Sequence, residues 1–250
     1  NMCRQEVFGE ILHGEAAYIH ELRGQMRQYE NGRGTGSWRT LHWANENGNL
    51  YPTHGLGPVA QYMNLARGDD NFGRLVSFSS PAKNHALYAK EKLGPDSKSA
   101  KLDFKGGDMS TSIIKTTLGR TVMVQWDESS PRPYSRHNLI QGTRGTGQAP
   151  PRIALDYTWK NATPALRKVL DLPEDQPNKS SNYHSWIEGG GFNAFYEYFD
   201  HPLFIRMQDI AKKHGGHGGM DAIMNFRAIE CLQKGEPLDQ NVYEGAFWSA

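Results

Sequence analysis

The alternation of apolar and polar positions predicts several strands. Ser110–Thr117 and Thr121–Asp127 alternate with a period of two on either side of Leu118-Gly119-Arg120, which is typical of a β-hairpin. Three further segments read as strands on the same grounds: Glu10–Leu22, Arg74–Ser80 and Arg136–Gly142. The polar, glycine-bearing segment Gln25–Gly36 is predicted to be a loop, and Ala149–Gly191 an irregular region with one short helix near Pro164–Leu170.

Helical spacing appears mainly in the C-terminal third of the chain. Gly219–Lys234 carries apolar residues three and four positions apart and ends at Gly235, so it predicts a helix. Pro202–Lys213 predicts another, and Asp239 caps a last one. Strands followed by segregated helices favour an α+β fold: an open mixed or antiparallel β-sheet with helices on one face.

The first predicted strand leaves space beside an aromatic side chain. Its period of two places Gly14, Ala16 and Tyr18 on one face. Because Gly14 and Ala16 are small, either a ligand or a packed helix can lie above them. Both interpretations stay open at this point.

The stretch Asn47–Gly68 concentrates polar chemistry. Tyr51, Thr53 and His54 lie within four positions, just before a short predicted helix over Val59–Leu65. Thr53 is predicted as its N-cap, Pro58 as an early helical position and Gly68 as its stop. Polar groups at a helix N-terminus favour negative charge and a neutral imidazole. The alternative is a structural loop with a buried tyrosine and histidine.

Composition excludes several classes of function. Lysine and arginine total 28 against 27 acidic residues, and this balance argues against a mainly electrostatic nucleic-acid binder. No apolar run approaches the roughly 18 residues of a membrane helix. Cys3 and Cys231 form neither a metal nor a disulfide pattern and do not indicate a compartment. No metal site is predicted.

Common catalytic motifs are missing or weak. Gly55–Ala60 and Gly189–Ala194 fit G-x-G-x-x-A, but neither opens a strand–helix–strand unit with an acidic residue about 20 positions on. There is no G-x-S-x-G elbow and no evident carboxylate pair. Arg39 beside Trp38 indicates surface packing or an anion contact. Tyr134, stiffened by two prolines, is either a positioned phenol or part of a rigid loop.

Taken together, Tyr18, Arg39, Tyr134 and the run Tyr51-Pro52-Thr53-His54 resemble a known family. The chain looks like the C-terminal domain of the Gfo/Idh/MocA oxidoreductases, and within them it is similar to glycoside hydrolase family 109, the NAD-dependent α-N-acetylgalactosaminidases. The matching segments are GEILHGEAAYIHELRG, GNLYPTHGLGPVAQYMNLARGD, SSPA, RPYSR with QGTRG, and GGHGGMD through LDQNVYEGAFWSA.

This resemblance implies that 1–250 is one C-terminal substrate-binding α/β domain of a longer protein, whose N-terminal Rossmann domain is absent from this chain. It implies that Tyr18, Tyr51, Pro52, Thr53, His54 and Tyr134 contact the sugar, and that Arg39 and Tyr51 touch NAD. We expect His54 and Tyr51 to carry the proton chemistry. The implied partner is a sugar ending in N-acetylgalactosamine, without nucleic acid or membrane.

The implied reaction needs no carboxylate pair. NAD takes a hydride from carbon 3 of the sugar, the ketone acidifies the hydrogen on carbon 2, and a base removes it with loss of the anomeric group. Water then adds and the hydride returns. The alternatives are an NAD(P)-dependent sugar oxidoreductase or a non-catalytic domain that forms homo-oligomers through its sheet face. By resemblance, export or a periplasmic location is plausible, but the sequence itself leaves localisation open.

Overall fold

The computed structural model describes residues 1–250. It contains nine α-helices and eight strands, which confirms the α+β class. The chain divides into two compact units. The sheet unit comprises Ile11–Gln141 with Ser249, and the helix-rich unit comprises Asn1–Glu10, Gly142–Trp248 and Ala250.

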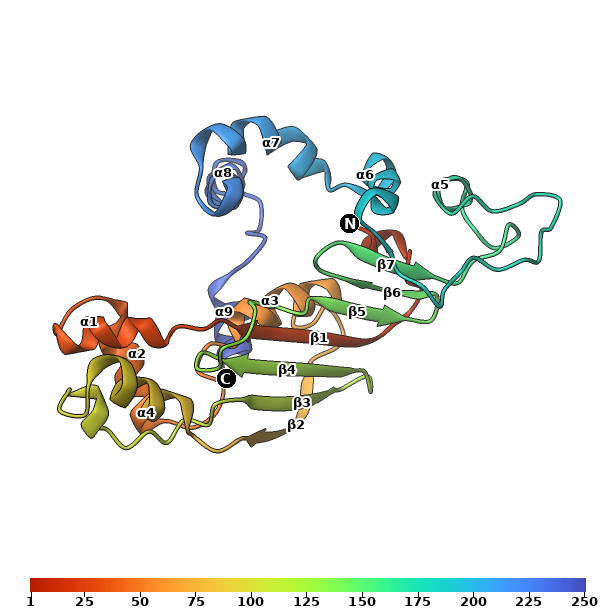
Figure 1. Ribbon diagram of the computed structural model, residues 1–250. Coiled ribbons are helices and arrows are strands. Elements are labelled where there is room, and N and C mark those ends of the chain that lie inside the picture. Colours follow the sequence, from red (N-terminus) through yellow and green to blue (C-terminus); the bar gives the residue numbers. More distant parts are fainter. The chain divides into compact units, whose positions relative to one another are not determined.

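The sheet unit is built on four long strands in the order β2-β3-β4-β1 (Figure 1). β1 pairs parallel with β4, whereas β4 with β3 and β3 with β2 are antiparallel, so the sheet is mixed. The predicted hairpin is confirmed as β3 and β4. The strands are β1 (Ile11–Ile19), β2 (Phe72–Ser79), β3 (Ser110–Thr116), β4 (Thr121–Asp127) and β5 (Leu139–Gly142), the last of which begins in this unit.

Helix α3 (Thr53–Tyr62) covers the face that carries Gly14, and this settles the choice between ligand and helix. A Cβ at Gly14 would lie 2.5 Å from Cγ1 of Val59 and 2.9 Å from Sδ of Met63. At Gly55 a Cβ would lie 2.6 Å from the backbone of Ala17. Gly14 and Gly55 therefore allow α3 to pack closely against β1.

The opposite face of this sheet lacks such a cover within the unit. In register, β2 and β3 place Val76 opposite Ile113 and Phe78 opposite Thr111. Val76, Phe78 and Ile113 are all exposed. The sheet unit thus has its helices on one face, as predicted.

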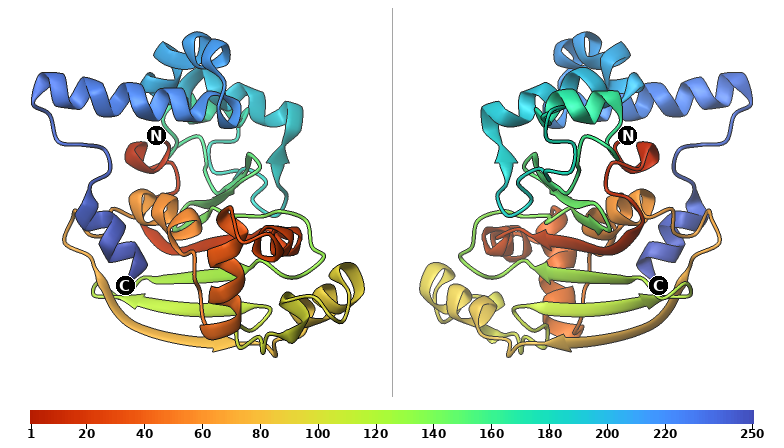
Figure 2. Two further views of the ribbon diagram at one scale, coloured as in Figure 1. Left: turned by 90° about the vertical axis from the view of Figure 1, so that its left-hand side faces the viewer. Right: turned by 90° about the vertical axis from the view of Figure 1, so that its right-hand side faces the viewer.

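The loop predicted over Gln25–Gly36 is wrong. The chain there forms α1 (Met26–Glu30) and the start of α2 (Thr35–Asn45), separated by a turn with Gly34 at φ 82°. Local preference disfavours these helices, but Met26 and Trp43 are fully buried, so tertiary packing stabilises them. Figure 2 shows this unit from two further sides, including α4 (Asn84–Tyr88).

The predicted bounds of the helix after Tyr51 are also wrong. α3 begins at Thr53, so Thr53 is its first residue, and Pro52 occupies the N-cap position without a side-chain cap. Pro58 lies inside the helix. α3 ends at Tyr62, well before Gly68, because Asn64 turns the chain with φ 53°.

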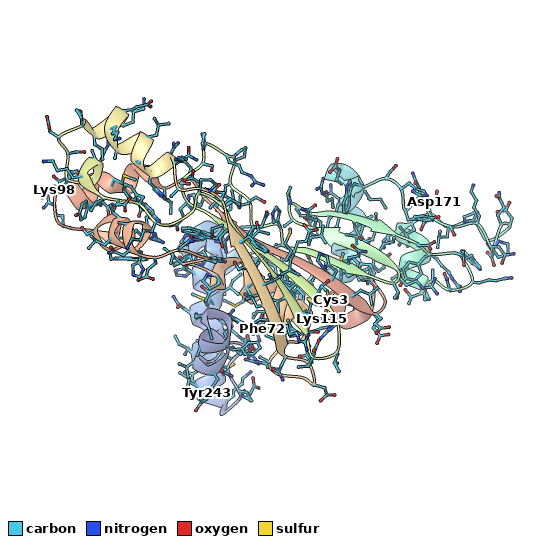
Figure 3. The ribbon with its side chains drawn as sticks, turned by 90° about the horizontal axis from the view of Figure 1, so that it is seen from below. Cys3, Phe72, Lys98, Lys115, Asp171 and Tyr243 are labelled. Atoms are coloured by element: carbon cyan, nitrogen blue, oxygen red, sulfur yellow. The ribbon has the colours of Figure 1, made fainter.

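The antiparallel edge of the sheet is clear in Figure 3. Phe72 begins β2 opposite Thr116, and Lys115 precedes that partner on β3. Phe72 and Lys115 therefore lie at the same end of the two strands. A register shift between Phe72 and Arg74 marks a bulge there.

The helix-rich unit holds three short antiparallel strands and the C-terminal helices. The region predicted to be irregular forms β7, α5, β8 and a helix start, so that prediction was only partly right. The elements are β6 (Gly145–Gln148), β7 (Arg152–Leu155), α5 (Pro164–Val169), β8 (Ile187–Glu188), α6 (Asn193–Phe199), α7 (Pro202–His214), α8 (Met220–Lys234) and α9 (Val242–Ser249).

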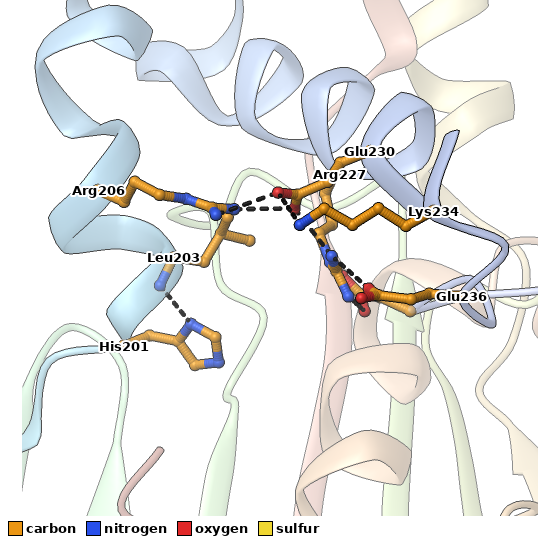
Figure 4. Close-up of polar contacts among 8 residues, drawn as sticks. His201, Leu203, Arg206, Arg227, Glu230, Lys234 and Glu236 are labelled. Atoms are coloured by element: carbon orange, nitrogen blue, oxygen red, sulfur yellow. Dashed lines mark hydrogen bonds and ion pairs between the residues drawn. The ribbon is translucent and has the colours of Figure 1, made fainter. Parts of the chain in front are cut away.

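Helices α7 and α8 confirm the two clearest helical predictions. They pack side by side, and Arg206 of α7 forms an ion pair with Glu230 of α8 (Figure 4). Gly235 ends α8 in the left-handed conformation at φ 68°, the role its position predicted. None of the helices has the length and apolarity needed to cross a bilayer.

Candidate functional site

Three rings from two elements form the centre of the candidate site. Tyr18 comes from β1, His54 from the first turn of α3, and Tyr51 from just before that helix. The ring centroids of Tyr18 lie 5.0 Å from Tyr51 and 4.9 Å from His54, and Tyr51 and His54 are 4.4 Å apart. The close approach of α3 to β1 at the glycines brings these rings together.

His20 extends this cluster, and the sequence analysis missed it. Residues 18 and 20 share a face because strand side chains alternate, and the Tyr18 hydroxyl is 3.0 Å from Nδ1 of His20. The His20 ring meets the Tyr134 ring edge-on at 5.0 Å. Tyr134 is 53% exposed, so it marks the solvent side of the cluster.

Arg136 is a second residue that sequence reasoning missed. Its Nε donates to the Tyr134 hydroxyl, and its Nη1 donates to the backbone carbonyl of His54 over 3.3 Å. The guanidinium carbon lies 5.9 Å from the Tyr18 ring centre. The spacing Tyr134–Arg136 repeats the spacing Tyr18–His20, and this period of two was the signal that could have found both.

Arg39 lies on the other side of Tyr51. Its guanidinium is 5.0 Å from the Tyr51 ring centre and 4.7 Å from that of Trp38, so it is held between two aromatic faces. Trp38, Arg39 and Tyr51 line a shallow depression together with His42, Trp43, Leu50 and Glu128. The anion-contact interpretation of Arg39 therefore remains a prediction with suitable geometry.

Glu128, which also lines this depression, is a third residue that the sequence did not reveal. Its Oε2 accepts a hydrogen bond from Nε1 of Trp43 at 2.9 Å. Its Oε1 lies 3.5 Å from Nε of Arg39, but neither atom makes a hydrogen bond. Both are buried, so the pair retains unused hydrogen-bonding capacity beneath Tyr51.

Burial sets the electrostatics of the cluster. Burial, followed by the nearby Glu128 carboxylate, raises the pKa of Tyr18 to about 12, so this phenol stays protonated at neutral pH. Burial raises the pKa of Glu128 as well. Burial and the cation of Arg136 lower the pKa of His20, which keeps its imidazole neutral at pH 7.

The structure thus brings most of the predicted residues into one place. Tyr18, Tyr51 and His54 touch, Arg39 packs on Tyr51, and Tyr134 joins through His20. Pro52 and Thr53 connect Tyr51 to His54, where they form the N-terminal edge of α3. No group of three or more His, Cys, Asp or Glu side chains is placed to hold a metal ion.

Comparison with known proteins places this arrangement in a family. A model described as "Glycosyl hydrolase 109, C-terminal domain" matches residues 1–250. The chain belongs to the glycosyl hydrolase 109 family. Glycosyl hydrolase family 109 protein 1 of Akkermansia muciniphila is 61% identical over 252 residues, which cover all of this chain and 48% of that protein. Family 109 protein 2 of Shewanella sp. strain MR-4 is 53% identical over 251 residues, which cover all of this chain and 50% of that protein.

Solved structures of dehydrogenases share the fold. A levoglucosan dehydrogenase in complex with NADH and L-sorbose gives a TM-score of 0.55 at 15% identity, over 98% of this chain and 55% of that one. An NAD binding oxidoreductase from Klebsiella pneumoniae gives a TM-score of 0.56 at 13% identity. The match covers 99% of this chain and 56% of that one. These neighbours show that the chain shares its fold with part of these oxidoreductases. The chain spans about half the length of the family 109 relatives it matches.

Proposed function

We propose that this family 109 chain is the substrate-binding domain of an NAD-dependent glycosidase. The substrate is a terminal α-linked N-acetylgalactosamine, and the route is oxidation, elimination, addition and reduction. The observation that supports this most is the packing of Tyr18, Tyr51 and His54 within 5.0 Å of one another. Phenols and an imidazole hold and move protons, as this route requires, whereas direct glycoside hydrolysis relies on two carboxylates.

We propose that the surface around Arg39 forms the part of this chain that contacts a nicotinamide dinucleotide. Arg39 presents a flat cation held between Trp38 and Tyr51, and its buried Nε lacks a hydrogen-bond acceptor. Arg39 and Tyr51 would contact the cofactor there through a charge-assisted bond and a ring face. When bound, NAD supplies the acceptance and return of a hydride.

The remaining chemistry belongs to side chains of this chain. His54 and Tyr51 accept and return the protons of the reacting sugar, since their rings touch and both lie at the N-terminal edge of α3. Tyr18 and Tyr134 bind the sugar through ring faces and hydroxyls, with Pro52 and Thr53 forming the rim between them. The half-buried rings exclude water from one side of the sugar.

We propose further that 1–250 is one half of the catalytic cleft. A dinucleotide is held chiefly by its pyrophosphate at a glycine-rich turn, and Arg39 and Tyr51 offer side contacts alone. Residues 1–250 in isolation should therefore bind the sugar weakly, bind NAD poorly and catalyse nothing. Calorimetry of the isolated chain with NAD checks this, and micromolar affinity would contradict it and direct attention to Gly55–Ala60.

The decisive experiment follows the hydrogen on carbon 2. The full-length protein is incubated with a chromogenic α-N-acetylgalactosaminide in deuterated water, and the released sugar is examined by mass spectrometry and NMR. Elimination and addition predict deuterium at carbon 2. Release without deuterium would overturn the route. His54→Gln and Tyr51→Phe should each lower kcat about 100-fold or more, and Tyr243→Phe, on the exposed surface of α9, is the matched control.

A sugar oxidoreductase is the second candidate, and the fold likeness to levoglucosan dehydrogenase favours it. That reaction releases reduced cofactor instead of recycling it. Growth of NADH absorbance in proportion to sugar consumed would support the oxidoreductase. Constant absorbance during release of the chromogenic group would support the glycosidase.

A non-catalytic role in self-association is the third candidate. The exposed side chains Val76, Phe78 and Ile113 on the uncovered sheet face favour it, and the occupant would be a second copy of this chain. Phe78→Lys should then lower the mass measured by analytical ultracentrifugation. An unchanged mass would remove this face from consideration.

A further inference from the structure

His20 occupies a place in the site that the reaction does not yet use. It follows β1 directly, two residues after Tyr18, with its Nδ1 3.0 Å from the Tyr18 hydroxyl. Its ring also meets Tyr18 edge-on at 5.5 Å and Tyr134 at 5.0 Å. His20 therefore contacts two side chains that we propose to bind sugar, one through a hydrogen bond and both through ring edges.

We infer that His20 is a positioning and relay residue that takes the hydroxyl proton of Tyr18 when Tyr18 accepts a proton from a sugar hydroxyl. The inference rests on the proposed function for the identity of the sugar. It adds a second acid–base couple, Tyr18 with His20, beside the couple of His54 and Tyr51. The proton on carbon 2 of the sugar and the proton of a sugar hydroxyl then have separate acceptors.

The proton balance of the relay is simple. In the proposed resting state the Tyr18 hydroxyl donates to Nδ1 of His20, so Nε2 carries the ring proton of the imidazole. A sugar O–H bond breaks and its proton forms a bond with the Tyr18 oxygen, while the former Tyr18 proton moves to Nδ1. Tyr18 ends neutral, His20 ends as imidazolium, and the sugar oxygen keeps its electron pair. Return of the protons restores the starting state.

The groups around the pair support this direction. A phenol held protonated by burial needs an acceptor before it can take another proton, and the neutral imidazole provides one. The charged or titratable groups that act on His20 are Arg136 and Arg39, which oppose its protonation, and Glu21, which favours it. Tyr18 and Tyr134 complete its surroundings.

Kinetics of the full-length protein test the relay. His20→Phe keeps a ring against Tyr18 and Tyr134 but removes the nitrogen, so kcat should fall about 100-fold while KM for the sugar changes less than about threefold. In the wild type, protonation of Nδ1 of His20 should give kcat an acid limb at a pH below about 6.5, because burial and Arg136 lower the pKa of this imidazole. Because His54 also accepts protons in the proposed reaction, His20→Phe should lose the limb of His20 and keep the one that protonation of His54 causes, so the two pH profiles should differ.

His13 provides the matched control. It lies on β1 with its side chain on the opposite face, where Nδ1 contacts Oγ1 of Thr121 at 2.8 Å. His13→Phe should leave kcat, KM and the acid limb unchanged. A kcat within threefold of the wild type in His20→Phe, or a pH profile that matches the wild type there, would overturn the relay.

A second measurement is independent of catalysis. With ¹⁵N-labelled histidine, Nδ1 of His20 should resonate as an unprotonated nitrogen and Nε2 as a protonated one at pH 8, and Tyr18→Phe should shift the Nδ1 signal. A protonated Nδ1 would reverse the hydrogen bond and contradict the relay. If the wild type does not release N-acetylgalactosamine but the nitrogen signals are as expected, the proposed substrate fails and the Tyr18–His20 couple stands.

Discussion

Two buried glutamates, one in each unit, are held in opposite ways. Glu128 in the sheet unit is 2% exposed and accepts one hydrogen bond, from Trp43. Glu230 in the helix-rich unit is 9% exposed and accepts bonds from Arg206, Arg227 and Lys234 at 2.8 to 3.1 Å (Figure 4). The pKa of Glu128 is raised by burial, whereas the cations, Arg206 first, lower the pKa of Glu230 to about 2.

The difference indicates that Glu230 has a structural role, whereas Glu128 belongs to the candidate site. Both oxygens of Glu230 are already bonded, to Arg206 of α7 and to Arg227 and Lys234 of its own helix, so it has no free acceptor for a ligand. Oε1 of Glu128 makes no hydrogen bond, and neither does Nε of Arg39, which lies 3.5 Å away. A partly satisfied polar pair in a low dielectric is costly, and proteins keep such departures mainly where they serve function. The unsatisfied pair therefore points to the depression under Tyr51.

The largest expected effect comes from neutralising Glu128. Glu128→Gln leaves the buried Arg39 cation uncompensated, and breaking a buried pair in this way costs about 3 kcal/mol of unfolding free energy. Urea titration of the chain would measure it. If the free energy of unfolding falls by less than about 1 kcal/mol, Glu128 does not stabilise the buried charge of Arg39. The contrast drawn between the two glutamates would then be wrong.

Gly55→Ala tests whether close packing, as well as charge, distinguishes the sheet unit. The new Cβ would lie 2.6 Å from the backbone of Ala17, so α3 must move off β1 at a cost of about 2 kcal/mol. Gly190→Ala is the control, because a Cβ there meets nothing within 4 Å. Thermal unfolding should separate the two variants, and equal melting temperatures would contradict the packing argument.

Low pH should destabilise the fold because of the buried side chain of His85. This histidine is 1% exposed and stacks on Trp43 at 4.3 Å, and burial lowers its pKa to about 3. The unfolded state therefore binds a proton first, and stability falls as pH drops below about 6.5. We expect a loss of about 2 kcal/mol at pH 5 relative to pH 8. His85→Phe should flatten this dependence, and an unchanged slope would exclude His85 as its source.

The smallest effect is expected from Glu230→Gln. Arg206 and Lys234 are about half exposed, so water can solvate their charges when the carboxylate is lost. The melting temperature should fall less than in Glu128→Gln, and added salt should narrow the gap to the wild type. A larger loss than in Glu128→Gln would reverse the comparison.

Periodic segments were predictable because their signal is local. The helix over Gly219–Lys234 and the β3–β4 hairpin follow from spacing and turn residues alone. The helices α1 and α2 were missed because three glycines in Gly32–Gly36 disfavour them locally. Their stability comes from Met26 and Trp43, whose burial depends on distant parts of the chain.

The same distinction applies to the site. Tyr51 and His54 could be paired from sequence because they are three residues apart at a helix start. Glu128 is 85 residues from Trp43, so its contact depends on the strand order and carries no local signal. His20 was within reach, since a period of two puts it beside Tyr18. The roles that resemblance assigns to Tyr18, Arg39 and Tyr134 remain predictions.

The parallel pairing of β1 with β4 has a consequence for how such proteins diversify. The two strands pair in register up to Ile19 and Asp127, so the segments that follow them leave the sheet at the same edge. His20 follows one strand and Glu128 the other. Insertions and substitutions after either strand can therefore reshape this edge while the register beneath stays intact. Divergence of sugar preference among relatives, and any laboratory library aimed at a new sugar, should concentrate in these two loops.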